Sequence, residues 1–332
     1  MIAAPRPGIP PLPAGPASRE LAPRPPLRIL YRGPLSSCNY DCPYCPFAKR
    51  VSPPEELRAD RAALARFCAF VEATADRTLE IFFTPWGEAL VRPWYREAMI
   101  ALSHLPHVRK VAAQTNLACG TGWIARADET TFALWVTYHP GEVAYPRFVA
   151  KCLSLARRGV RFSVGVVGLR EHEPHARRLR ADLPPEVYVW VNAYKRGGPA
   201  YYSDADRAAF TSVDPLFAFN AVAHESRGME CATGETVISV DGDGRVRRCH
   251  FVPEVLGDLY TDDLDSMLRP RPCPNATCGC HIGHVHLARL GLDSVFEGGV
   301  LERIPRAARS LPVLSPDTPS RGAPSPGIPS SP

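Results

Sequence analysis

The sequence of 332 residues has no apolar run of about 18 residues, the length that a membrane-spanning helix needs. It also does not open with the basic segment, apolar core and small-residue cleavage site of a secretory signal. These two absences predict a cytoplasmic protein without a membrane partner. Because thiols stay reduced in the cytoplasm, clustered cysteines are expected to bind metal there rather than to form disulfides.

Lysine is scarce, with 4 residues against 35 arginines, which we attribute to compositional bias. A surplus of positive charge is missing from most of the chain. The formal net charge is +5, and residues 1–27 and 306–332 each contribute +2, which leaves +1 for the rest. A nearly neutral body gives no support to a nucleic-acid partner.

Proline is concentrated at the two ends of the sequence. Residues 1–27 hold 9 of the 36 prolines and residues 306–332 hold 7, with few side chains that could form a core. Both segments are therefore predicted to be disordered tails. The residues between them suffice for one large domain, over 28–220, and one small domain, over 221–305.

Short apolar runs alternate with helical patterns across the large domain. The runs are nearly continuous in apolar character, which is typical of parallel strands covered on both faces. Six β/α units predict an α/β fold, and since the usual barrel has eight, we expect a partial (β/α)6 TIM-like barrel with its active site at the carboxyl ends of the strands. The expected strands are 27–31, 78–84, 108–114, 132–138, 161–167 and 187–193, and the expected helices are 55–75, 93–105 and 145–158.

The alternation stops after about residue 220. Two runs at 235–240 and 245–251 flank an Asp-Gly-Asp-Gly sequence that favours a hairpin turn, and a short helix is expected over 262–268. This small α+β domain has too few apolar residues to be stable without a staple or tight docking.

Three of the 11 cysteines, Cys38, Cys42 and Cys45, fall in the loop after the first expected strand. Three thiolates at this spacing can ligate three irons of a four-iron cluster and leave the fourth iron open to a substrate. A structural zinc site would need a fourth ligand nearby, and no further cysteine or histidine occurs before Cys68.

The Cys-x3-Cys-x2-Cys motif after the first strand resembles the signature of the radical S-adenosylmethionine (SAM) superfamily. The resemblance implies a [4Fe–4S] cluster whose open iron binds SAM, an electron donor such as flavodoxin or ferredoxin, and cleavage of SAM to a 5′-deoxyadenosyl radical. That radical would abstract hydrogen from a peptide or small-molecule substrate. The likeness to a bacterial radical SAM family extends from about Leu27 to Pro305.

The same resemblance assigns SAM-binding residues to later strand ends. Tyr44 matches the aromatic residue near the adenine, and Gly87 and Glu88 match a Gly-Gly-Glu segment that binds the SAM amino group, although Trp86 replaces its first glycine. Asn116 and Thr137 match residues that contact the ribose or carboxylate of SAM. Arg170 and Glu171 match the end of a motif near the adenine. His139, at a strand end, is either a substrate or proton-transfer residue or a structural histidine, and Asn192, Tyr194 and Lys195 are expected to face the cavity.

The last five cysteines resemble the C-terminal auxiliary-cluster extension called SPASM or, when shorter, twitch. One four-iron cluster would use four of them and leave one spare, and the spacing does not show which. His281, His284 and His286 leave a zinc site open as an alternative. Cys68 and Cys152 are expected to be core residues. The five are Cys231, Cys249, Cys273, Cys278 and Cys280.

A second hypothesis is a non-catalytic iron–sulfur or zinc protein that serves as a scaffold or in electron transfer. The Glu88 segment argues against it, because a scaffold has no need of a SAM-binding strand end.

Overall fold

The structure is a computed structural model that describes residues 24–47 and 50–306, so residues 1–23 and 307–332 of the two predicted tails lie outside the described residues. None of the helices within those ranges combines the length and apolar character needed to cross a bilayer. The α-helices are α1 (Pro54–Ala73), α2 (Pro93–Ser103), α3 (Tyr145–Arg157), α4 (Glu173–Asp182), α5 (Asp204–Val213), α6 (Phe217–Ala221), α7 (Leu264–Met267), α8 (His281–His284) and α9 (Leu292–Phe296).

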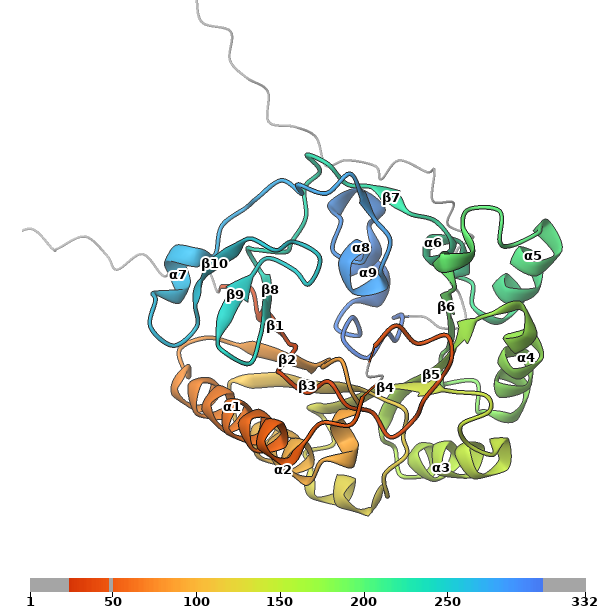
Figure 1. The fold of residues 1–332 in the computed structure, drawn as a ribbon, viewed down its shortest axis with the longest axis horizontal. Helices are drawn as coiled ribbons and strands as arrows, with labels where there is room; N and C mark the ends of the chain where they lie inside the picture. The colour runs from red at the N-terminus through yellow and green to blue at the C-terminus, as the bar shows by residue number, and fades with distance from the viewer. Residues whose placement is uncertain (1–23, 48–49, 307–332) are drawn as a thin grey trace, which may run out of the picture.

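The described residues form a nine-stranded sheet in the order β10-β9-β8-β1-β2-β3-β4-β5-β6 and a small sheet of β7 and β11. Strands β1 to β6 run parallel in sequence order, as predicted for six β/α units, and the sheet curves into an arc with helices on its outside (Figure 1). The strands are β1 (Leu27–Tyr31), β2 (Leu79–Phe83), β3 (Val108–Thr115), β4 (Phe132–Tyr138), β5 (Arg161–Gly168), β6 (Val189–Ala193), β7 (His224–Glu225), β8 (Val237–Val240), β9 (Arg245–Arg247), β10 (Val255–Asp258) and β11 (Thr277–Cys278).

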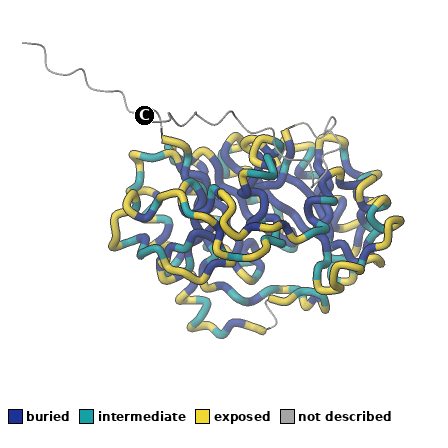
Figure 2. Tube along the Cα trace, turned by 90° about the horizontal axis from the view of Figure 1, so that it is seen from above, coloured by how far each residue is buried: buried dark blue, intermediate teal, exposed yellow. Residues whose placement is uncertain are grey.

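Alternate residues of several barrel strands face two different cores. In β4, Leu134 and Val136 pack outward against the helices, whereas Trp135 points to the inner side of the arc. The inner core also contains Val285 and Phe296 of the C-terminal segment, and α8 and α9 lie inside the arc in Figure 1. Figure 2 shows the buried residues concentrated in the middle of the body. The C-terminal segment therefore fills the interior of the partial barrel.

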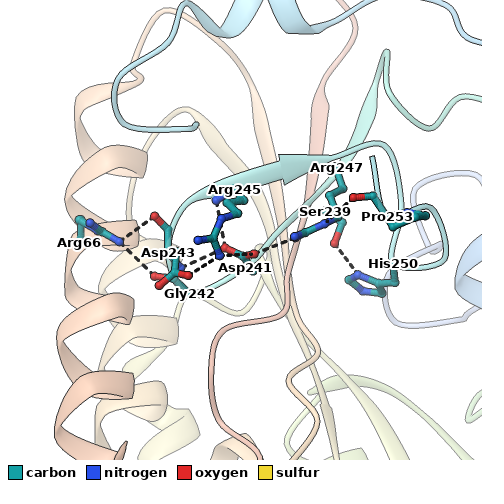
Figure 3. A network of polar contacts seen from close by, with 9 residues as sticks. All are labelled: Arg66, Ser239, Asp241, Gly242, Asp243, Arg245, Arg247, His250 and Pro253. Carbon is teal, nitrogen blue, oxygen red and sulfur yellow. Dashed lines mark hydrogen bonds and ion pairs between the residues drawn. The ribbon is translucent and has the colours of Figure 1, made fainter. Parts of the chain in front are cut away.

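The predicted hairpin forms, as β8 and β9, and continues the barrel sheet because β8 pairs in parallel with β1. Its turn is held against α1 by Arg66, which donates to the carbonyl oxygens of Gly242 and Asp243 at 3.1 and 3.0 Å (Figure 3). Arg247 pairs with Asp241 at 2.7 Å across the same hairpin. The pairing of β8 with β1 and the Arg66 contacts attach the hairpin to the barrel.

A buried ion pair fixes the C-terminal segment to the barrel. Nζ of Lys110 in β3 lies 2.6 Å from Oε1 of Glu302, and the Glu302 side chain is fully buried. We expect Glu302→Ala to lower the free energy of unfolding by about 3–5 kcal/mol, because it leaves the Lys110 ammonium buried without its partner. Chemical denaturation measures this. Glu97→Ala, which removes the exposed pair between Glu97 and Arg126, should change stability little, and equal effects of the two variants would contradict the account.

Candidate functional site

A cavity of about 360 Å³ opens at the carboxyl ends of the barrel strands, within the size range of small-molecule sites. Residues from the loop after β1 line the cavity together with residues from β6 and the start of α8. It brings together most of the predicted site residues, namely Cys38, Cys42, Tyr44, Cys45, Gly87, Glu88, Asn116, Thr137, His139, Asn192, Tyr194 and Lys195.

The cysteine loop is held in place by the segment that follows β2. The backbone N–H of Gly87 donates to Leu35 at 3.1 Å, and that of Glu88 donates to Ser37 at 3.1 Å. Within the loop, the N–H of Cys45 donates to the carbonyl of Cys42 at 3.0 Å and forms a tight turn. These backbone contacts position the three thiols on one side of the cavity.

Gly87 permits this close approach because a Cβ atom at its position would lie 1.9 Å from the carbonyl oxygen of Ser37. We expect Gly87→Ala to displace the loop next to Cys38 and to lower the iron content after anaerobic reconstitution. Gly122→Ala is the matched control, since a Cβ there meets nothing within 4 Å. Full iron loading of Gly87→Ala would show that the loop does not depend on this contact.

Glu88 lies at the junction of three segments and is 5% exposed. Its carboxylate accepts hydrogen bonds from the N–H of Leu90 at 2.9 Å, the hydroxyl of Thr115 at 2.7 Å and the N–H of Asn116 at 2.6 Å. Burial raises the pKa of Glu88, and these three donors oppose that shift. The carboxylate therefore ties the ends of β2 and β3 together while lining the cavity.

Burial also shifts the pKa values of two thiols of the loop and of a neighbouring histidine. It raises the pKa of Cys42 to about 12 and that of Cys38 above its usual value. The protonated thiols must release their protons when metal binds. His139 Nδ1 lies 3.3 Å from Cys42 Sγ and 3.0 Å from Tyr44 Oη, and burial lowers the pKa of His139 to about 4, so this ring is neutral near pH 7.

Two residues that were predicted to lie near the SAM adenine are found outside this cavity. Arg170 and Glu171 are absent from the cavity wall. The Arg170 guanidinium stacks on the ring of Tyr201 and pairs with Asp206 at 3.2 Å.

Asn116 does face the cysteine loop, and its side-chain amide donates to Asn39 at 3.0 Å.

A further part of the cavity wall is built by Lys195, Cys280 and His281. Lys195 donates to the carbonyl oxygens of Val222, at 2.9 Å, and Gly279. Burial lowers the pKa of Lys195 to about 8. Its contact with Gly279 joins the end of β6 to the start of α8, next to Cys280, and its contact with Val222 joins β6 to the end of α6.

The C-terminal cysteines, Cys280 included, lie close enough together to influence one another electrostatically. The pKa of the Cys278 thiol is raised to about 12, first by burial and then by the electrostatic influence of the other four C-terminal cysteines. Cys231, Cys249 and Cys273 are all buried. A set of neighbouring thiols is the donor set that an iron–sulfur cluster requires.

The alternative of a zinc site rests on His281, His284 and His286. All three are buried, and none of their ring nitrogens has a hydrogen-bond partner. In the described ranges, no group of three or more His, Cys, Asp or Glu side chains could hold a single metal ion. A four-iron cluster spreads its thiolates around a cube of irons, which is a wider arrangement than the ligand set of one ion.

Sequence reasoning missed the aromatic lining of the cavity. Trp86, Trp135 and Trp190 reach it, and Arg32 stacks on the Trp86 ring at 3.9 Å. The two other tryptophans lie within expected strands, where continuous apolar character hides which residues point inward. Inward positions could have been found only by fixing the register of each strand.

No model of a known protein family matches the chain, and no curated protein matches its sequence. Among solved structures, native anSMEcpe with bound AdoMet is 16% identical, with 73% of this chain and 80% of that chain covered and a TM-score of 0.50. Native anSMEcpe with bound AdoMet and Kp18Cys peptide is 14% identical, with the same coverages and TM-score. Streptococcus suis SuiB bound to S-adenosylmethionine is 13% identical, with 72% and 64% covered and a TM-score of 0.46. At these identities the anSMEcpe structures establish the fold alone, and they agree with the predicted partial barrel.

Proposed function

Because the chain has the fold of radical SAM enzymes, we propose that it is one. The observation that carries the proposal is a single cavity at the strand ends that holds three thiols on one loop, Cys38, Cys42 and Cys45, together with the Glu88 carboxylate. The donor set fits a four-iron cluster with one open iron. When bound, that cluster supplies the electron that cleaves SAM to methionine and a 5′-deoxyadenosyl radical.

The protein's own residues bind and orient SAM in this proposal. The Glu88 carboxylate receives the SAM ammonium, a charge-assisted contact strengthened by burial. Asn116 and Thr137 lie at the neighbouring strand ends and contact the carboxylate or ribose, and Tyr44 packs near the adenine. The aromatic lining limits the access of water to the reacting atoms.

We propose a second, auxiliary four-iron cluster in the C-terminal region. The electrostatically coupled cysteines supply its ligands. A donor of the flavodoxin or ferredoxin class delivers electrons to the protein. The wall that contains Lys195 meets the substrate, a peptide or a small metabolite, and the peptide held by anSMEcpe in one similar structure is in keeping with the first of these.

Anaerobic reconstitution tests the metal part of the proposal. Two four-iron clusters give about eight irons per chain, whereas a zinc site in the C-terminal region leaves about four. After reduction, added SAM should change the electron paramagnetic resonance spectrum of the cluster with the open iron. A fully loaded protein whose spectrum ignores SAM would favour the non-catalytic iron–sulfur scaffold instead.

A further inference from the structure

Cys280 is electrostatically coupled to Cys278, but it differs from the other four C-terminal cysteines in its relation to the cavity. It lines the same cavity as Cys38, Cys42 and Cys45, which none of the other four does. The strongest charged influences on its thiol come from Lys195, Arg32 and Arg303. The charged influences on Cys249 are those of Arg248, Cys231 and Cys273. One C-terminal sulfur therefore faces the reaction cavity while four remain to ligate a cluster.

The adjacent residue gives independent evidence that something binds at this wall. His281 lines the cavity and is only 4% exposed, and neither of its ring nitrogens has a hydrogen-bond partner. Leaving a buried polar group unpaired costs about 1–3 kcal/mol. An unpaired histidine of this kind next to a cysteine that lines the cavity indicates a site prepared for a bound molecule.

The thiol is held in place by its backbone. Cys280 is the N-cap residue of α8, and its carbonyl accepts from the N–H groups of Gly283 and His284, both at 2.9 Å. The preceding carbonyl, that of Gly279, accepts from Lys195. The backbone before the sulfur is thus fixed to the barrel, and the backbone after it is fixed within α8.

Resting on the proposed function, we propose that Cys280 is the spare cysteine and that its thiol donates a hydrogen atom to a carbon radical in the cavity. The S–H bond of Cys280 breaks homolytically and a C–H bond forms, which leaves a sulfur-centred radical. One electron from a low-potential donor of the flavodoxin or ferredoxin class and one proton from water restore the thiol. The four cluster ligands are then Cys231, Cys249, Cys273 and Cys278.

Iron content and thiol mapping test the assignment without turnover. Cys280→Ala should keep the wild-type iron content, whereas Cys278→Ala should lose about half of the iron. In reconstituted wild-type protein, iodoacetamide should alkylate Cys280 and spare the four ligands, as read by peptide mass spectrometry. Loss of iron from Cys280→Ala, or protection of Cys280 in the loaded protein, would overturn the proposal.

The hydrogen transfer itself is tested without the substrate. SAM cleavage is run in D2O with dithionite and no added thiol, so the Cys280 proton is exchanged for deuterium. We expect a single deuterium in the 5′-deoxyadenosine made by wild type and by the control Cys68→Ala, and its loss in Cys280→Ala. Equal deuterium in all three would contradict hydrogen donation by Cys280. Absence of 5′-deoxyadenosine in all three would instead refute the proposed function, and iron content and alkylation would still decide the place of Cys280.

Discussion

Cys42→Ala is expected to abolish SAM cleavage and to lower the iron content from about eight to about four per chain. Cys42 is 4% exposed and lies in the centre of the three-thiol loop. A four-iron cluster with one open iron needs all three protein ligands, so removing one leaves two open irons and an unstable cluster. The measurements are iron analysis and chromatography of 5′-deoxyadenosine.

Cys68→Ala is the matched control for this loss. Cys68 lies on α1 and packs at the edge of the outer core, where it has no contact with the cavity. It should keep the wild-type iron content and rate of SAM cleavage. If Cys42→Ala retained eight irons or cleaved SAM at the wild-type rate, the loop would not be the cluster site.

Glu88→Gln is expected to weaken SAM binding by about 10- to 100-fold, since a charge-assisted hydrogen bond is worth about 1.5–3 kcal/mol. The change removes the negative charge that receives the SAM ammonium. It also replaces one carboxylate oxygen by an NH2 group, which cannot accept the hydrogen bond that this oxygen accepts in the wild-type protein. Equilibrium binding of SAM to the reconstituted protein measures the effect.

Glu142→Gln is the control that shows whether the loss of SAM affinity is specific to Glu88 or follows from removing any negative charge near the cysteine loop. Glu142 accepts a hydrogen bond from the N–H of Asp41 at 3.3 Å, so it adjoins the cysteine loop, but it does not line the cavity. SAM affinity should remain close to wild type in this variant. Equal losses in Glu88→Gln and Glu142→Gln would mean that Glu88 does not bind SAM directly.

The sequence predicted the barrel well because its strands are short apolar runs covered on both faces. All six expected strands form, with ends displaced by at most two residues. The helix α4 was not predicted, because only Ala176 and Leu179 of its ten residues are buried and its many charges conceal the helical pattern.

The C-terminal segment was harder to predict, because its burial depends on distant contacts. His281, His284 and His286 are polar residues that the sequence favours at a surface, yet they lie within the barrel interior. The position of Cys280 in the cavity likewise depends on the contact between Lys195 and Gly279, which are 84 residues apart. Local spacing carries no information about such a contact.

The central claim, that this protein cleaves SAM reductively, is tested most directly by one assay. The wild-type protein, reconstituted anaerobically to about eight irons per chain, is incubated with SAM and dithionite. The account predicts 5′-deoxyadenosine and methionine in equal amounts, and neither product without the reductant. Absence of 5′-deoxyadenosine from the fully loaded, reduced protein would contradict it.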